Sequence, residues 1–330
     1  MTPLMHAVVE PANEILVKAL IRHGAKVNAR DNKGSTALIW ACGVKGNENI
    51  VKILLKAGAS LNAGAANHVR ALDMAIRSAA NGDTYKEPRS ASLIDLLLRH
   101  GAKLTSKDPL LYEAWLVAVA AKDGLNLARR IVHLGIDVNM PDRDGITALM
   151  GAAIGNPNPE MVKFLIKSGA RIDTVSRNGT TALLYATQYN NPEVVKFLLA
   201  ETEKTAGKAL PEAELLLRAA SNRDPEVVKL FLTRGADINS TDDLGRTPLF
   251  FAARFSAPEA IKALIAAGAD VNTCDKYGFS ALMAAAEMSI SPETVKILVD
   301  AGARIDCVDS EQGRTALDFA LENENLKDTE

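Results

Sequence analysis

Aromatic residues are scarce in this chain, although it is rich in apolar residues of other kinds. Phe, Trp and Tyr together make up 5% of the 330 residues, whereas hydrophobic residues as a whole make up 48%. A composition dominated by Ala, Leu, Val and Ile favours thin layers packed one on the next over a single thick core.

The chain has no marked excess of basic or acidic residues, and it has no long apolar run. The 38 basic and 40 acidic residues give a formal net charge of −2, whereas a nucleic-acid-binding domain usually shows a clustered basic excess. No apolar run approaches the length of a membrane span. We therefore expect neither a nucleic-acid partner nor insertion into a membrane.

Cysteine is nearly absent as well. The chain has three cysteines, Cys42, Cys274 and Cys307, whose spacing fits neither a disulfide framework nor a zinc site. This usage predicts a reducing compartment, which for most proteins means the cytoplasm.

What the chain does contain is one segment that returns many times. Its copies end in Gly-Ala, and three pairs of these glycines stand 34 positions apart: Gly24 and Gly58, Gly135 and Gly169, and Gly268 and Gly302. A fixed period of this length predicts a single array of stacked units spanning 1–330. The expected repeats are 1–30, 31–64, 65–107, 108–141, 142–175, 176–208, 209–241, 242–274, 275–309 and 310–330.

Residues 142–170 illustrate how one unit should fold. Gly145 supplies the positive φ of a tight finger, and Thr147 is placed to cap a short first helix over 148–154. Asn158 and Pro159 then form a helix start, because Asn caps free amides and Pro fits the first helical position. Gly169 ends this second helix. The same second-helix start recurs at Asn191-Pro192-Glu193, Asp224-Pro225-Glu226 and Ser291-Pro292-Glu293.

These features resemble the ankyrin repeat, which has a β-turn finger, a Thr-Pro-Leu-His-x-Ala helix start and a second helix. The matching segments are Thr2-Pro3-Leu4, Thr36-Ala37-Leu38, Thr147-Ala148-Leu149, Thr181-Ala182-Leu183, Thr247-Pro248-Leu249, Ser280-Ala281-Leu282 and Thr315-Ala316-Leu317. The family's usual His after Leu is missing from all of them. The Asn-Pro-Glu helix start is similar to bacterial members. The resemblance implies an all-α ankyrin-repeat solenoid of about ten helix-turn-helix units with short β-turn fingers.

The pattern breaks in several places. Glu113 and Glu214 occupy the Thr position, after Asp108-Pro109 and Leu210-Pro211, so we expect these first helices to start early and the fingers to be lost. Extra residues fall at 81–90, and residues 200–208 lack the Gly-Ala ending. One interpretation is drift in a fold that tolerates surface insertions; the other is that the breaks bend the array or bind a partner.

No constellation of residues suggests catalysis, a metal site or a cofactor. His23, His100 and His133 lie near the ends of second helices, where a cation suits the helix dipole. The recurring aspartates Asp142 and Asp242 are turn residues, which their spacing places in a row and not in a ring. We also expect five asparagines after the second helices to bond backbone groups, namely Asn28, Asn62, Asn139, Asn239 and Asn272.

The resemblance places partner binding on the finger tips and the exposed face of the first helix. Residues at these positions in the sixth to ninth repeats predict an apolar strip with an arginine, a composition typical of interaction hot spots: Tyr189, Leu244, Arg246, Phe255, Tyr277, Phe279 and Met288. The alternative is that several of them, Phe255 and Met288 first, pack under neighbouring fingers.

The predicted function is therefore a non-catalytic protein-protein interaction scaffold that uses the concave finger and first-helix surface, with a protein partner and no small-molecule substrate. The alternative is a targeting module of a larger enzyme or secreted effector. The start in mid-repeat at Met1, and the acidic residues 321–325 in place of a second helix, favour a piece of a longer chain. The other interpretation of the last repeat is that its polar residues cap the array, as the end of a repeat array requires.

Overall fold

The computed structural model describes residues 1–10, 13–65, 68–80, 90–206, 211–222, 224–255 and 257–326. Within these ranges the chain forms helices and no strand, apart from an isolated antiparallel bridge between Cys274 and Ser280. The chain divides into two compact units. The first comprises Met1–Arg143 and Thr147–Ala170, and the second comprises Asp144–Ile146 and Arg171–Glu330. The predicted all-α fold is confirmed.

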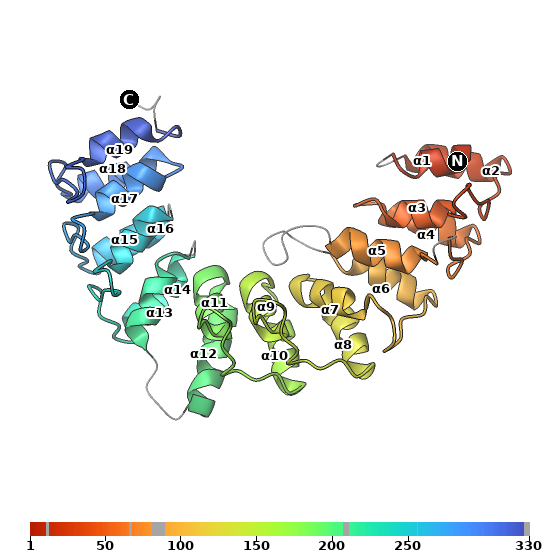
Figure 1. Cartoon of the computed structure of the whole chain (residues 1–330), viewed down its shortest axis with the longest axis horizontal. Coiled ribbons are helices and arrows are strands. Elements are labelled where there is room, and N and C mark those ends of the chain that lie inside the picture. Colours follow the sequence, from red (N-terminus) through yellow and green to blue (C-terminus); the bar gives the residue numbers. More distant parts are fainter. Residues whose placement is uncertain are drawn as a thin grey trace. The chain divides into compact units, whose positions relative to one another are not determined.

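The helices are short, and within the described residues all except α19 come in pairs (Figure 1). The first unit contains α1 (Pro3–Ala7), α2 (Glu14–Arg22), α3 (Ala37–Cys42), α4 (Glu48–Lys56), α5 (Ala71–Ala80), α6 (Ser92–Arg99), α7 (Leu111–Ala120), α8 (Leu125–His133), α9 (Ala148–Gly155) and α10 (Pro159–Lys167). The second contains α11 (Ala182–Tyr189), α12 (Pro192–Ala206), α13 (Glu212–Ala219), α14 (Pro225–Thr233), α15 (Pro248–Arg254), α16 (Pro258–Ala266), α17 (Ala281–Met288), α18 (Pro292–Asp300) and α19 (Ala316–Glu322).

Each unit is built from two layers of helices. In the second unit, α11, α13, α15, α17 and α19 each pack on the next member of this series, and α12, α14, α16 and α18 do the same. In the first unit, α1, α3, α5, α7 and α9 form the same kind of series, and among the second helices α2 packs on α4 and α6 packs on α8. First helices such as α17 are buried on nearly all sides, which explains their alanine content.

The helix starts follow the sequence signals. The Thr147 hydroxyl accepts a hydrogen bond from the amide of Met150, and the side chain of Asn158 accepts one from the amide of Glu160. Gly145 and Gly169 adopt φ of 77° and 94°. The caps predicted at Asn191, Asp224 and Ser291 are also present. In these repeats the local sequence therefore sets where the helices begin and end.

Asparagines join successive repeats in two ways. Those after the second helices reach the next repeat, as when Asn139 Nδ2 donates to the Gly169 carbonyl at 2.9 Å. The prediction that they bond backbone is confirmed, and the partner is the following repeat. A second set is buried after the first helices: Asn156 Nδ2, for example, donates to the carbonyls of Val119 and Ala121, both at 2.8 Å. Buried polar groups satisfied in this way fix the stacking register.

The breaks in the pattern have structural counterparts. The helices α7 and α13 begin at Leu111 and Glu212, ahead of the Thr position, so the predicted early starts are confirmed. The helix α12 runs on to Ala206, beyond the point where its counterparts end. The extra residues lie between α5 and α6, but 81–89 fall outside the described residues, as do 207–210.

Candidate protein-interaction surface

Three fingers of the second unit are held by an aspartate at their base, namely Asp242, Asp275 and Asp309. One Asp242 carboxylate oxygen accepts hydrogen bonds from the amides of Leu244 at 3.0 Å and Arg246 at 2.9 Å, and the other accepts from Arg246 Nε at 2.8 Å. Burial acts to raise the pKa of Asp242, but these hydrogen bonds outweigh it and hold the pKa below its usual 3.8. The aspartate therefore fixes where Leu244 and Arg246 lie.

Neighbouring fingers are also joined directly. The Lys276 amide donates to the Leu244 carbonyl at 2.9 Å. The next finger repeats the contact, because the Ser310 amide and hydroxyl donate to the Tyr277 carbonyl at 2.8 and 2.7 Å. Three fingers thus form one hydrogen-bonded series, which fixes the backbone that carries Leu244 and Tyr277.

An aromatic row runs beneath these fingers. The Phe279 ring packs between Phe250, at 6.2 Å between ring centroids, and Phe319, at 4.9 Å. Arg246 lies over the Phe251 ring at 5.0 Å, and Arg314 lies over Phe319 at 4.1 Å. Because each is engaged in this way, Arg246 and Phe279 are half-buried, and so is Leu244.

The other four strip residues are largely exposed. Tyr189, Phe255, Tyr277 and Met288 keep 50%, 49%, 48% and 44% of their surface accessible. The alternative of burial under neighbouring fingers therefore does not hold for these four. Tyr189, Phe255 and Met288 end or follow α11, α15 and α17, as expected.

The strip is interrupted between Tyr189 and Phe255, where α13 carries no aromatic residue. The structure adds Ile290, which is 72% exposed just beyond Met288. Its signal in the sequence was its place directly before Ser291, which caps the second helix, where the repeat of α12 carries the polar Asn190. Arg314 was also not predicted as part of the strip. Its signal in the sequence was its position directly after Gly313, which is equivalent to that of Arg246 after Gly245.

Groups that could perform chemistry do not converge. Within the described ranges, no cluster of three His, Cys, Asp or Glu could hold a metal ion. Burial raises the pKa of the Cys42 thiol to about 12, so that thiol is not a nucleophile at neutral pH. The rings of His23, His100 and His133 bond the carbonyls of Ala19, Leu96 and Arg129 at their own helix ends. No helix in the described part of the chain is long and apolar enough to span a bilayer.

Comparison with known proteins agrees with this architecture. Family models described as ankyrin repeats (3 copies) match residues 1–65, 116–208 and 216–309, and a model for ankyrin repeats (many copies) matches 291–330. Human "Ankyrin repeat and SOCS box protein 6" is 28% identical over 136 residues, which is 38% of this chain and 32% of that protein. "Palmitoyltransferase ZDHHC17" of Danio rerio is 34% identical over 79 residues, which is 23% of this chain and 13% of that enzyme.

Among solved structures, the human ASB11 ankyrin repeat domain aligns with a TM-score of 0.48 and 24% sequence identity, covering 67% of this chain and 96% of that domain. The chain spans about a third or less of the curated relatives named above. Family models, by contrast, match most of its length. The chain therefore belongs to the ankyrin repeat family.

Proposed function

We propose that this chain is a non-catalytic protein-interaction scaffold that binds a protein partner through the concave finger and first-helix surface of its second unit. Ankyrin repeats in general are protein-interaction modules. The observation that carries the proposal is the exposure of Phe255, Tyr277 and Met288 beside fingers already joined by hydrogen bonds. Rigid aromatic anchors on an ordered surface lose little conformational entropy on binding.

Two residues of the strip are better suited to a test than the rest. Tyr277 and Phe255 are both about half exposed, so truncating them removes surface and little core. Phe279 is less suitable because it packs on Phe250 and Phe319, so that Phe279→Ala lowers stability as well as binding.

The experiment is affinity capture with the whole chain and with a Phe255→Ala/Tyr277→Ala variant. If the two rings are hot spots, the variant loses about 2 kcal/mol or more of the free energy of binding to the captured partner. Its melting temperature stays close to that of the wild type. The matched control is Ile305→Ala, which truncates an exposed apolar residue outside the strip. A partner retained equally by all three proteins would contradict the proposal.

A second candidate is that the array recruits partners for a larger enzyme or effector. It is favoured because the named relatives are much longer than the matched segment. The match covers 32% of the SOCS box protein and 13% of the palmitoyltransferase. Sequencing the full transcript tests this: an open reading frame that encodes a catalytic domain beside the array supports it, and one confined to ankyrin repeats contradicts it.

A further inference from the structure

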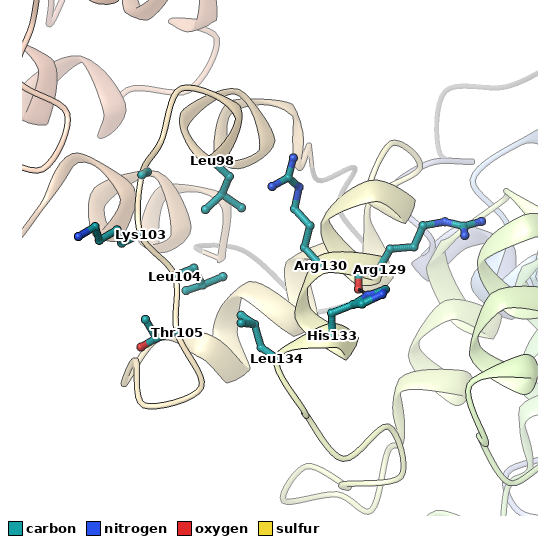
Figure 2. Close-up of a pocket in the computed structure, with 9 residues that line it drawn as sticks. Leu98, Lys103, Leu104, Thr105, Arg129, Arg130, His133 and Leu134 are labelled. Atoms are coloured by element: carbon teal, nitrogen blue, oxygen red, sulfur yellow. Dashed lines mark hydrogen bonds between the residues drawn. The ribbon is translucent and has the colours of Figure 1, made fainter.

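A groove in the first unit combines an apolar floor with a basic rim (Figure 2). It lies between the successive second helices α6 and α8, has a volume of about 490 Å³ and is open to solvent. Leu98, Leu104 and Leu134 line its floor and are only half-buried. A volume of this size is typical of ligand sites, and three partly exposed leucines in one hollow present apolar surface to an occupant.

The rim carries basic side chains from both sides of the groove. Arg129, Arg130 and His133 come from α8, and Lys103 comes from the segment after α6 (Figure 2). All four are exposed. Arg129 also lies 5.3 Å from the Phe164 ring, which holds its guanidinium in place.

Two carboxylates lie near this rim. Glu160 on α10 accepts a hydrogen bond from Lys163 at 2.7 Å, which is the first cause of its lowered pKa, and the charge of Arg129 contributes to the same shift. Asp95 on α6 forms an ion pair with Arg99, and its other oxygen is 3.6 Å from Arg130 Nε. No acidic residue is among those that line the groove. Lys103 and Arg129 therefore offer positive charge to a ligand, in a chain whose net charge is close to zero.

The corresponding groove of the second unit shows that this charge is not a general property of the fold. Between α16 and α18, the position two residues before the terminal glycine is Asp300, where the α8 position is His133. Likewise Ile297 stands where α8 has Arg130. The rim cation there, Lys262, is bridged to Glu259 at 2.7 Å and Glu293 at 3.3 Å.

We infer that the groove between α6 and α8 binds an acidic, leucine-bearing peptide segment of a partner protein. Aliphatic side chains of the segment occupy the leucine floor, and its carboxylates pair with Lys103 and Arg129 on opposite sides. An open hollow with charge on both edges suits a chain passing through it better than an enclosed small molecule. The site is separate from the strip of the second unit and does not depend on it.

The binding test uses a fluorescein-labelled synthetic peptide that alternates glutamate and leucine. The whole chain should bind this peptide, and more weakly as salt rises. A peptide with serine in place of leucine should bind at least about fivefold more weakly, and one with lysine in place of glutamate should not bind, because either change removes one half of the complementarity.

Charge reversal locates the site. The double variant Lys103→Glu/Arg129→Glu should raise the dissociation constant of the peptide at least about tenfold. The matched control, Lys26→Glu/Lys167→Glu, makes the same change in net charge at exposed lysines outside the groove and should stay within about twofold of the wild type. Equal losses in the two variants would show non-specific attraction and overturn the inference.

A measurement on the unaltered chain guards against misfolded variants. On titration with the peptide, the methyl NMR signals of Leu98, Leu104 and Leu134 should shift, whereas those of Ile265 and Ile297 in the α16–α18 groove should not. Unmoved leucine signals would overturn the inference, as would binding to phosphatidylserine vesicles with no binding to the peptide. The Phe255→Ala/Tyr277→Ala variant should bind the peptide normally, so failure of the strip proposal and failure of this one are distinguishable.

Discussion

The two units solve the same stacking problem with different local chemistry, as residues 242–314 and residues 65–134 show. In 242–314, the fingers begin with Asp242 and Asp275 in the pattern Asp-x-x-Gly, and with Asp309 in the longer pattern Asp-x-x-x-Gly. Each aspartate binds its own backbone, and successive fingers bond each other. The segment 65–134 contains no such finger sequence. Its first helices α5 and α7 nevertheless pack on their neighbours as α15 and α17 do.

An arginine occupies the place of a finger in 65–134. Arg70 stands at the Thr position before α5, and its guanidinium forms ion pairs with Asp73 at 2.7 Å and Asp108 at 2.5 Å. It also donates to the Lys103 carbonyl at 2.9 Å, in the next repeat's approach segment. The pKa of Arg70 is raised, with the hydrogen bond to Asp73 as the first cause. Helix stacking is thus the shared requirement, and the finger is one of two ways to tie the loops.

The largest effect is expected at Trp115, which occupies the position of Leu249 and Leu282 and is 1% exposed. This repeat lacks a finger, and its core side chain at this position is larger than the leucine of the fingered repeats. Trp115→Ala should lower the free energy of unfolding by about 3–5 kcal/mol, because it leaves a large cavity. Urea unfolding followed by circular dichroism measures this. A loss below about 1 kcal/mol would show that the fourth repeat does not depend on its tryptophan.

A smaller effect separates the two kinds of loop tie. Arg70→Met leaves Asp73 and Asp108, both little exposed, without their cation, and should cost about 3 kcal/mol. Arg246→Met should cost about 1 kcal/mol, because Asp242 keeps two backbone amides as donors. The same unfolding measurement applies. Equal losses would mean that Arg70 is no more structural than a finger arginine.

For substitutions of glycine, the larger loss of stability is expected in the fingered segment 242–314 and the smaller one in 65–134. Gly278 in the ninth-repeat finger has φ of 73°, and a Cβ there would lie 3.1 Å from the Val308 carbonyl oxygen. Gly278→Ala should cost about 1–2 kcal/mol through backbone strain. Gly64, in the approach to α5, has no positive φ, and its Cβ would meet atoms only at 3.7 Å. Gly64→Ala should change stability by less than about 0.5 kcal/mol in thermal melts.

Local signals in the sequence were sufficient to predict most of the fold. Caps such as Thr147 and Asn158 act within a few residues, so they could be recognised without knowing the neighbours. The Arg70 cluster could not be predicted, because Asp108 lies 38 positions away in an irregular segment. The same limit applies to the buried asparagines, whose partners belong to the previous repeat.

The candidate site was predicted in kind but not in detail. Exposure of Tyr277 followed from its place at a finger tip, whereas the half-burial of Phe279 depends on Phe319 of the next repeat. The basic groove was missed because His133 and Arg130 read singly as solvated residues at a helix end. Only the packing of α8 against α6 brings them over a leucine floor.

The smallest expected effect is on the dependence of stability on pH. Burial and the hydrogen bonds from Arg246 and Leu244 act in opposite directions on Asp242, and the net result is a pKa below 3.8 in the folded chain. A lowered pKa contributes stability that is fully present above the unfolded value and is lost as pH falls through the folded value. Asp242→Asn should therefore be less stable than the wild type at pH 7, and the difference should shrink below about pH 4. Urea midpoints measured at successive pH values test this, with Asp243→Asn as the control, because Asp243 is an exposed finger residue. A difference that stays constant down to pH 2 would show that the Asp242 carboxylate does not hold the finger by its charge, and the fingered repeats would then be tied by their backbone pairing alone.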